Sequence, residues 1–150
     1  MKFIASLAIA AAACAVAAPA SAQFAKPEDA VKYRQSALFV MSQHFGRIGA
    51  MVNGRAPYDA KSALENAETV ENMSHLPWAG FVPASEGISQ KAKADIWKEQ
   101  VKFKEHNEKL MGETSKLVAA AKTNNLDNLK TAFGQTAAAC KACHDNFRNN

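Results

Sequence analysis

Two cysteines and a histidine near the C-terminal end, in the order Cys140-Lys141-Ala142-Cys143-His144, constrain the fold more than any other feature of the chain. On a helix, residues three positions apart lie on one face, so both thiols can reach the same edge of one porphyrin ring. The next residue, His144, then points its imidazole at the centre of that ring. This order is the covalent attachment signature of c-type haem, with the histidine as an axial ligand of the iron. Only six residues follow His144, so any second axial ligand must come from far upstream.

Other uses of paired cysteines fit this motif less well. A thioredoxin-like dithiol opens a helix after a strand, whereas this motif lies near the end of a helical pattern. A structural zinc site needs four cysteine or histidine ligands at paired spacings, and the chain has no second cysteine pair. A disulfide between Cys140 and Cys143 would close a small strained loop and constrain little. Haem attachment is therefore favoured, with a redox dithiol or a zinc site as the alternatives.

The segment 1–22 has the pattern of a secretory signal peptide. Met1-Lys2 gives a positive start, an apolar run rich in alanine follows, and Ala20-Ser21-Ala22 resembles a cleavage site. The run is short for a membrane span and contains a proline, and the residues before Cys14 do not favour a lipoprotein signal. We therefore expect cleavage after Ala22 and one mature domain at residues 23–150.

The remaining composition limits how this domain is stabilised. Cys14 leaves with the predicted signal peptide, so both remaining cysteines belong to the haem motif and no disulfide framework is possible. Stability must then come from one hydrophobic core and from the buried haem. The full chain carries 18 Lys and Arg against 14 Asp and Glu, interspersed along the sequence. This charge pattern indicates a solvated surface rather than a nucleic-acid site. It is compatible with an acidic electron-transfer partner but does not indicate one.

Four amphipathic helical patterns and no convincing strand follow the signal peptide. We expect these helices at residues 27–52, 59–75, 91–122 and 126–148. In each, apolar residues recur at the three-to-four spacing of a core-facing helix. Pro27 suits the first turn of the first helix, and the acidic residues after it complement the helix dipole. The segment 77–89 is rich in proline and glycine but carries large apolar side chains, so we expect a loop that packs on the protein.

These patterns predict an all-α fold, an antiparallel (up-down) four-helix bundle with one covalently bound haem c. The last helix carries both Cys140 and Cys143 on its apolar stripe, so both sulfurs should face the interior. A bundle core is a usual place for a cofactor site built from facing helices.

Four stretches of the sequence are similar to one known family. They are Gln23-Phe24-Ala25-Lys26-Pro27-Glu28-Asp29-Ala30, Tyr33-Arg34-Gln35-Ser36-Ala37-Leu38, Leu76-Pro77-Trp78, and Cys140-Lys141-Ala142-Cys143-His144-Asp145 with Arg148. Together they resemble the cytochrome c′ family, class II of the c-type cytochromes, over essentially the whole of residues 23–150. The haem motif at the C-terminal end, with no room for a downstream methionine ligand, separates this family from class I cytochromes c.

The resemblance implies a periplasmic homodimer with one haem c in each chain. It implies an iron that is five-coordinate, ligated by His144 alone, with the apolar side chain of Leu38 closing the opposite, distal face. Such proteins bind small diatomic gases, notably nitric oxide and carbon monoxide, and are proposed electron carriers with a redox protein partner. An apolar distal group cannot ligate iron, so it leaves an open coordination position in a dry pocket.

The motif and the resemblance together give the candidate site residues. Cys140 and Cys143 are the expected thioether anchors, and His144 is the expected metal ligand. By resemblance, four further residues contact the haem: Arg34, Gln35, Glu86 and Arg148. A charged residue in an apolar seam, as Arg34 is, needs an anionic partner, and a haem propionate would supply one. Glu86 is also interpretable as an ordinary loop acid, and Arg148 as a solvated arginine at a helix C-terminus.

Two other functions remain open at this point. Met41 lies one turn beyond Leu38 on the same stripe, and as a second axial ligand it would give a six-coordinate, low-spin electron-transfer cytochrome. The second is an enzyme such as a peroxidase, because an open haem site permits some peroxide chemistry. The expected distal pocket has no histidine base or arginine to cleave an O–O bond, so we do not expect an enzyme.

Overall fold

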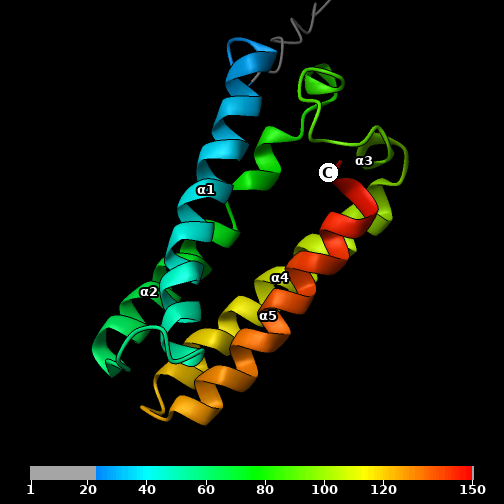
Figure 1. The fold of residues 1–150 in the computed structure, drawn as a ribbon. Helices are drawn as coiled ribbons and strands as arrows, with labels where there is room; N and C mark the ends of the chain where they lie inside the picture. The colour runs from blue at the N-terminus through cyan, green and yellow to red at the C-terminus, as the bar shows by residue number, and fades with distance from the viewer. Residues whose placement is uncertain (1–22, 150) are drawn as a thin grey trace, which may run out of the picture.

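The computed structural model describes residues 23–149, so the predicted signal peptide at 1–22 lies outside the described residues. In chain order the elements are α1 (Pro27–Val52), α2 (Ala60–Ser74), η1 (Pro77–Gly80), η2 (Pro83–Ser85), α3 (Asp95–Lys98), α4 (Gln100–Ala121) and α5 (Leu126–Phe147). The four long helices α1, α2, α4 and α5 run alternately in opposite directions (Figure 1). The predicted all-α, up-down four-helix bundle is confirmed.

The ends of the long helices follow from local chemistry. The carboxylate of Asp59 accepts a hydrogen bond from the amide of Ser62 at 2.6 Å and so caps the start of α2. The side chain of Asn125 caps α5 in the same way, accepting from two backbone amides. At α1, Pro27 occupies the first turn and needs no hydrogen bond there. Pro27 was predicted as a helix-start signal, and the first, second and fourth expected helices agree with the structure to within one residue.

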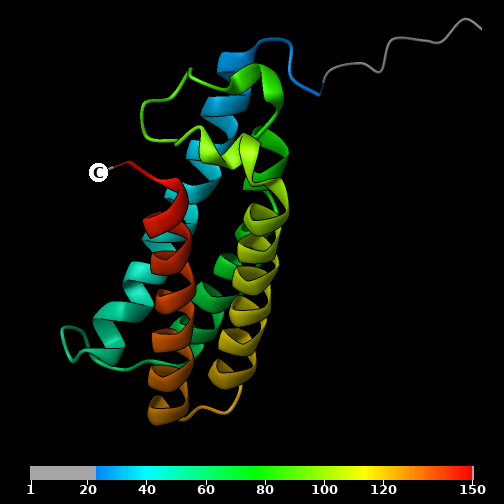
Figure 2. The same cartoon turned by 90° about the vertical axis from the view of Figure 1, so that its right-hand side faces the viewer.

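The expected third helix was wrong at its start. It begins at Gln100 rather than Lys91, because the backbone at Glu99 (φ −110°, ψ 49°) separates it from the short α3. The residues before α3 pair instead with the end of α5. The amide of Lys93 donates to the carbonyl of Phe147 at 3.0 Å, and the amide of Asn149 donates to the carbonyl of Lys91 at 3.1 Å. These contacts tie this segment to the chain end (Figure 2).

The apolar core fills the end of the bundle that lies away from the C-terminus. The main core cluster includes one fully buried large residue from each long helix: Ile48, Val70, Leu117 and Leu129. At the other end a second cluster, mostly aromatic, is formed around Ile96, Phe103 and Phe147. None of the helices among residues 23–149 has the length and apolar character needed to cross a membrane.

The loop between α2 and α3 packs on the protein, as expected. The ring of Phe81 meets that of Phe103 edge-on, with centroids 4.9 Å apart, and Trp78 contacts both. The indole nitrogen of Trp78 donates to the carbonyl of Ser74 at 2.7 Å. Gly80 permits the closest approach, because a Cβ atom there would lie 2.6 Å from the carbonyl oxygen of Ala30. The loop therefore forms one wall at the wider end of the bundle.

Candidate functional site

A cavity of about 1250 Å³ lies between α1 and α5 at the end of the bundle where the chain finishes. This is larger than the pockets that hold most small ligands. Its inner walls are mainly apolar and come from every long helix and from the loop after α2. The apolar side chains include Leu38, Met41, Phe45, Val70, Trp78, Phe81, Ile96, Phe103, Leu110 and Phe147. The bundle core thus leaves space for a large, mainly apolar group.

Cys140, Cys143 and His144 all line this cavity. Cys140 packs on the main core cluster and Cys143 on the aromatic cluster, and both side chains are partly buried. The expectation that both sulfurs face the interior is therefore confirmed. His144 follows at the outer edge of the cavity, in the last turn of α5.

The environment of the two thiols opposes a redox role. Burial raises the pKa of Cys140. Burial, and secondarily the neighbouring Cys140, raises the pKa of Cys143 to about 11. Reactive dithiols need the opposite shift, and they obtain it at helix N-termini, whereas these cysteines lie near the C-terminus of α5. Among residues 23–149, moreover, no three His, Cys, Asp or Glu side chains are grouped as a metal site would need. The geometry favours neither the dithiol nor the zinc alternative.

Arg34 lines the cavity and is almost completely buried, with 2% of its surface exposed. Its Nη1 donates to the carbonyl oxygen of Gly80 at 2.6 Å and to the hydroxyl of Ser85 at 2.7 Å. Its guanidinium carbon lies 4.5 Å from the ring centre of Phe81 and 5.8 Å from that of Trp97. Burial lowers the pKa of this group, but arginine stays charged at neutral pH.

The other terminal nitrogen of Arg34, Nη2, has no hydrogen-bond partner among the described residues. A buried cation with an unsatisfied donor is costly unless an anion completes it. A carboxylate on a group bound in the cavity would do so, and haem carries two such propionates. The residues present therefore fit haem, with two thiols and an imidazole at one wall and a buried cation at another.

The remaining residues of the α1 wall differ in their contacts. Leu38 and Met41 both line the cavity; Leu38 is partly buried and packs against the main core cluster, while Met41 is 7% exposed and belongs to that cluster. Gln35 also lines the cavity, is exposed, and donates to the hydroxyl of Ser89 at 3.3 Å. The structure thus brings Gln35 and Leu38 to the site together with Arg34.

Two further sequence candidates lie in different places. Arg148 lines the cavity beside the last turn of α5. The pKa of His144 is lowered by burial first and by the charge of Arg148 second, while Asp145 opposes the shift. Glu86 is exposed in the loop after η2 and does not line the cavity, so the structure does not bring it to the site.

Sequence reasoning missed part of the cavity wall. Thr136 and Ala137 lie one turn before Cys140 on α5, and helical spacing alone was a sufficient signal to include them. Lys91 and Lys93 also line the cavity, but no signal in the sequence revealed them. They reach it through the pairing of their segment with the end of α5.

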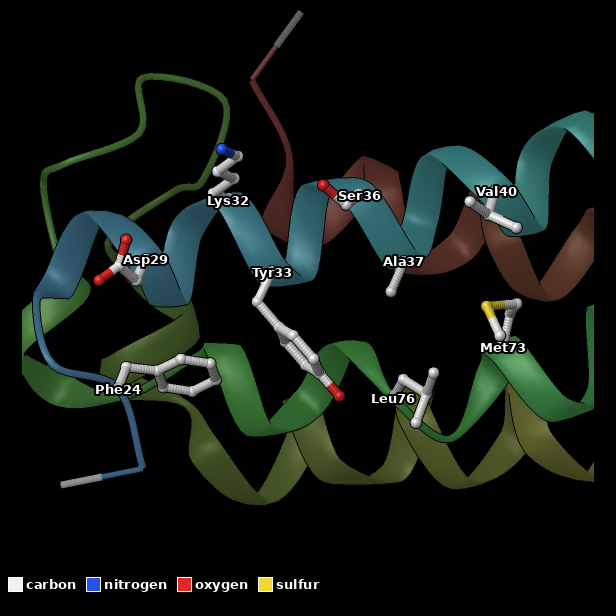
Figure 3. Close-up of a pocket in the computed structure, with 9 residues that line it drawn as sticks. All are labelled: Phe24, Asp29, Lys32, Tyr33, Ser36, Ala37, Val40, Met73 and Leu76. Carbon is white, nitrogen blue, oxygen red and sulfur yellow. The ribbon is translucent and has the colours of Figure 1, made fainter. Parts of the chain in front are cut away.

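A second hollow of about 510 Å³ lies on the outside of the bundle, between α1 and the end of α2. Tyr33, Ala37 and Val40 come from α1 and face Met73 of α2 and Leu76 just after it (Figure 3). The ring of Phe24 packs against Tyr33 with centroids 5.2 Å apart. The residues that line this open groove include no cysteine or histidine, so it is not the cofactor site.

Comparison with known proteins gives consistent matches over the described residues. The family model described as Cytochrome C' matches residues 29–148. A cytochrome c' of Alcaligenes xylosoxydans xylosoxydans is 50% identical over 126 residues, which cover 84% of this chain and 98% of the relative. A cytochrome c' of Rubrivivax gelatinosus is 44% identical over 127 residues, covering 84% of this chain and 98% of the relative.

Solved structures match the fold equally well. The crystal structure of cytochrome c' from Rubrivivax gelatinosus aligns with a TM-score of 0.81 at 44% identity, over 85% of this chain and 100% of that one. A nitric oxide complex of a variant of cytochrome c prime from Alcaligenes xylosoxidans aligns with a TM-score of 0.80 at 48% identity. That alignment covers 85% of this chain and 99% of that one.

Proposed function

Since this chain belongs to the cytochrome c′ family, whose members carry covalently bound haem c, we propose that it is a periplasmic haem protein that binds small gases at a five-coordinate iron. Nitric oxide and carbon monoxide are the proposed ligands, with electron transfer as a second capacity. The nitric oxide complex of a relative 48% identical to this chain supports the choice of ligand.

The proposed attachment uses residues from opposite walls of the cavity. Cys140 and Cys143 would form the two thioether bonds, and His144 would ligate the iron from the α5 side. Arg34 would bind a propionate through Nη2, the donor that has no partner in the protein. Gln35 and Arg148 line the cavity on either side and would contact the edges of the ring. When bound, the haem supplies an iron with one open coordination position.

The five-coordinate assignment rests on one observation. The side chain of Leu38 lies on the cavity wall that faces α5. A hydrocarbon group cannot ligate iron, and it keeps water and anions out of the space in front of it. Neutral diatomic molecules enter such a space more easily than charged ones. Leu38 would have to move aside for a ligand to bind, so it would also slow entry.

The alternative is a low-spin electron-transfer cytochrome with Met41 as the second ligand. Met41 lies one turn from Leu38, and exchanging their places would need a shift of about 5 Å along the helix. Its side chain is buried and packs with the core cluster, which such a shift would disrupt. Evolved peroxide chemistry is also not proposed. Among the described residues that line the cavity, His144 is the one imidazole, and it is assigned to the iron.

Export and dimer formation belong to the same proposal. The signal pattern at 1–22 supports transfer to the periplasm and cleavage after Ala22. The groove between α1 and α2 supports a homodimer, because it leaves apolar side chains in water, with Val40 38% and Leu76 37% exposed. A second copy that packs on this face would cover them.

The visible spectrum of the ferrous holoprotein tests the coordination. A broad, unsplit band is expected for iron with one axial ligand, and added carbon monoxide should change it. Sharp, split α and β bands would establish a second protein ligand and overturn the gas-binding proposal. Mass spectrometry of the exported protein should show one haem added to a chain that begins at Gln23.

A further inference from the structure

Four basic side chains gather at the mouth of the cavity, where α5 ends. They are Lys91, Lys93, Lys141 and Arg148, all of which line the cavity, and we call them the basic rim. Lys91, Lys141 and Arg148 are exposed, and Lys93 is partly exposed. The first two precede α3 and the last two belong to the chain end, which lies beside that segment in Figure 2.

Specific contacts hold the basic rim together. The Nζ of Lys93 donates to the backbone carbonyl of Asp145 at 2.9 Å, and the Nζ of Lys141 lies 2.6 Å from the carboxylate of the same residue. The backbone bridge between Ala92 and Arg148 joins the two segments. The four cations therefore occupy one small region although 57 positions separate the first from the last (91 to 148).

The charge of this region is not balanced locally. Among the residues described, Asp145 is the one acidic side chain that lines the cavity, and Lys141 already pairs with it. Four cations against one carboxylate leave a surplus of three positive charges. The net charge of the whole chain is +4, and one of these positive charges belongs to Lys2 in the predicted signal peptide.

An exposed aromatic residue lines the same cavity. Phe39 on α1 lines the cavity and is 63% exposed. Ile88, which precedes the cavity-lining Ser89, is 44% exposed. Protein interfaces combine an apolar centre with a polar rim, and aromatic residues are enriched in the centre. Phe39 would supply the apolar, aromatic part of such an interface, and the basic rim would supply its polar part.

We propose that Phe39 and the basic rim form the docking site of an acidic protein that exchanges single electrons with the haem. The inference rests on the proposed function, because the site has this use only if haem occupies the cavity behind it. One electron passes between the partner's redox centre and the iron, each changes its oxidation state by one, and no bond is made or broken. Like charges would repel a basic partner from the same face.

The expected interface is small and transient. Redox complexes bury less than about 1200 Å² in total, and charge complementarity mainly raises their association rate. That rate should fall steeply with ionic strength, because charges farther apart than about 8 Å are screened at physiological salt.

The test reverses two charges of the basic rim in the holoprotein, Lys91→Glu with Lys141→Glu. Both residues are exposed, and neither is assigned a contact with haem. The matched control is Lys61→Glu with Lys130→Glu, which changes the net charge equally. Lys61 begins α2 and Lys130 lies near the start of α5, about 16 Å along the helix from Lys141.

Two probes are used at low salt. The first is fluorescently labelled polyglutamate, whose binding is followed by anisotropy. The second is the anionic oxidant hexacyanoferrate(III), which takes one electron from the ferrous protein and becomes hexacyanoferrate(II). We expect the rim variant to lose at least about tenfold in affinity for polyglutamate and several-fold in oxidation rate, while the control changes each less than about twofold. Added salt should reduce the difference.

Three results would overturn the docking site. Equal losses in the two variants would show that net charge alone attracts the probes. Binding of the wild-type holoprotein to anionic lipid vesicles, abolished by the rim reversal and tighter than polyglutamate binding, would assign the face to a membrane surface. Absorption spectra and carbon monoxide binding of the same samples keep the proposed function separate. If these are normal and the rim reversal leaves the affinity for polyglutamate unchanged, the docking site is wrong and the gas-binding function stands.

Discussion

Arg34 donates a hydrogen bond at 2.6 Å to the carbonyl oxygen of Gly80, a residue 46 positions later in the chain. The same glycine lets the loop come so close that a Cβ atom on it would lie 2.9 Å from the Cβ of Arg34. The buried position of the Arg34 guanidinium and the lack of a side chain at Gly80 therefore depend on each other. Together they seat the loop after α2 against α1 and complete one wall of the cavity.

Gly80→Ala should destabilise the holoprotein. The added methyl group would lie 2.6 Å from the carbonyl oxygen of Ala30, and backbone atoms cannot move aside as a flexible side chain can. We expect a loss of about 1–3 kcal/mol in the free energy of unfolding, measured with urea. Gly112→Ala is the control, because no atom lies within 4 Å of its added Cβ in the interior of α4. That variant should gain about 0.5–1 kcal/mol. Equal changes in both variants would contradict the close approach.

Arg34→Met should also destabilise the holoprotein, for a different reason. Methionine keeps much of the volume but leaves the Gly80 carbonyl, the Ser85 hydroxyl and the proposed propionate without their donor. Removing one partner from such a buried charged contact costs about 3–5 kcal/mol. Urea unfolding of the holoprotein measures the loss, with the exposed Arg47→Met on the same helix as control. A cost no larger than that of Arg47→Met would argue against a propionate partner.

Leu38→Ala should raise the rate at which carbon monoxide and nitric oxide bind to the ferrous protein. If the side chain must leave a mainly apolar space before a ligand enters, the cost adds about 1.5 kcal/mol to the barrier. Its removal should then speed binding about tenfold, measured by stopped-flow absorbance. Val40→Ala is the control, because Val40 lines the outer groove rather than the cavity (Figure 3). Unchanged rates in Leu38→Ala would place the barrier at another residue.

The two cysteines should make the apoprotein lose more stability in alkali than the holoprotein does. The folded chain raises the pKa of Cys143 from 9.0 to about 11, so it keeps a proton that the unfolded chain has already lost. The stability linked to this thiol is therefore complete below about pH 9 and falls as the pH rises toward 11. Thioether sulfurs cannot ionise, so haem attachment removes this dependence. Urea unfolding of the apoprotein and the holoprotein between about pH 9 and 11 measures this difference. If the free energy of unfolding falls equally with pH in both forms, Cys143 does not have a raised pKa.

The architecture was predictable because its determinants are local. Spacing of apolar residues gave the four helices, Pro27 and Asp59 marked two of their starts, and the stripe on α5 placed Cys140 and Cys143 inside. The haem motif gave the chemistry of the site in the same way. Its three residues are adjacent in sequence, so their relation needs no knowledge of the tertiary fold.

What escaped prediction depends on contacts between distant segments. The late start of α4 follows from the pairing of Lys91 and Lys93 with the chain end, which no local pattern encodes. The family resemblance suggested Arg34 as a haem contact, but its bonds to Gly80 and Ser85 required the loop to be placed. For Glu86, a haem contact stays a prediction from the resemblance, since the loop leaves this residue outside the set that lines the cavity.

The pairing between Lys91 and Asn149 has a practical consequence for anyone who handles this protein. Chain ends are usually loose and tolerate additions, but here Arg148 and Asn149 are fastened to the edge of the cofactor pocket. A purification tag added after Asn149 would start next to that opening and compete with whatever approaches it. Polyhistidine is the least suitable choice, because its imidazoles are good iron ligands and would be held close to the pocket by their own tether.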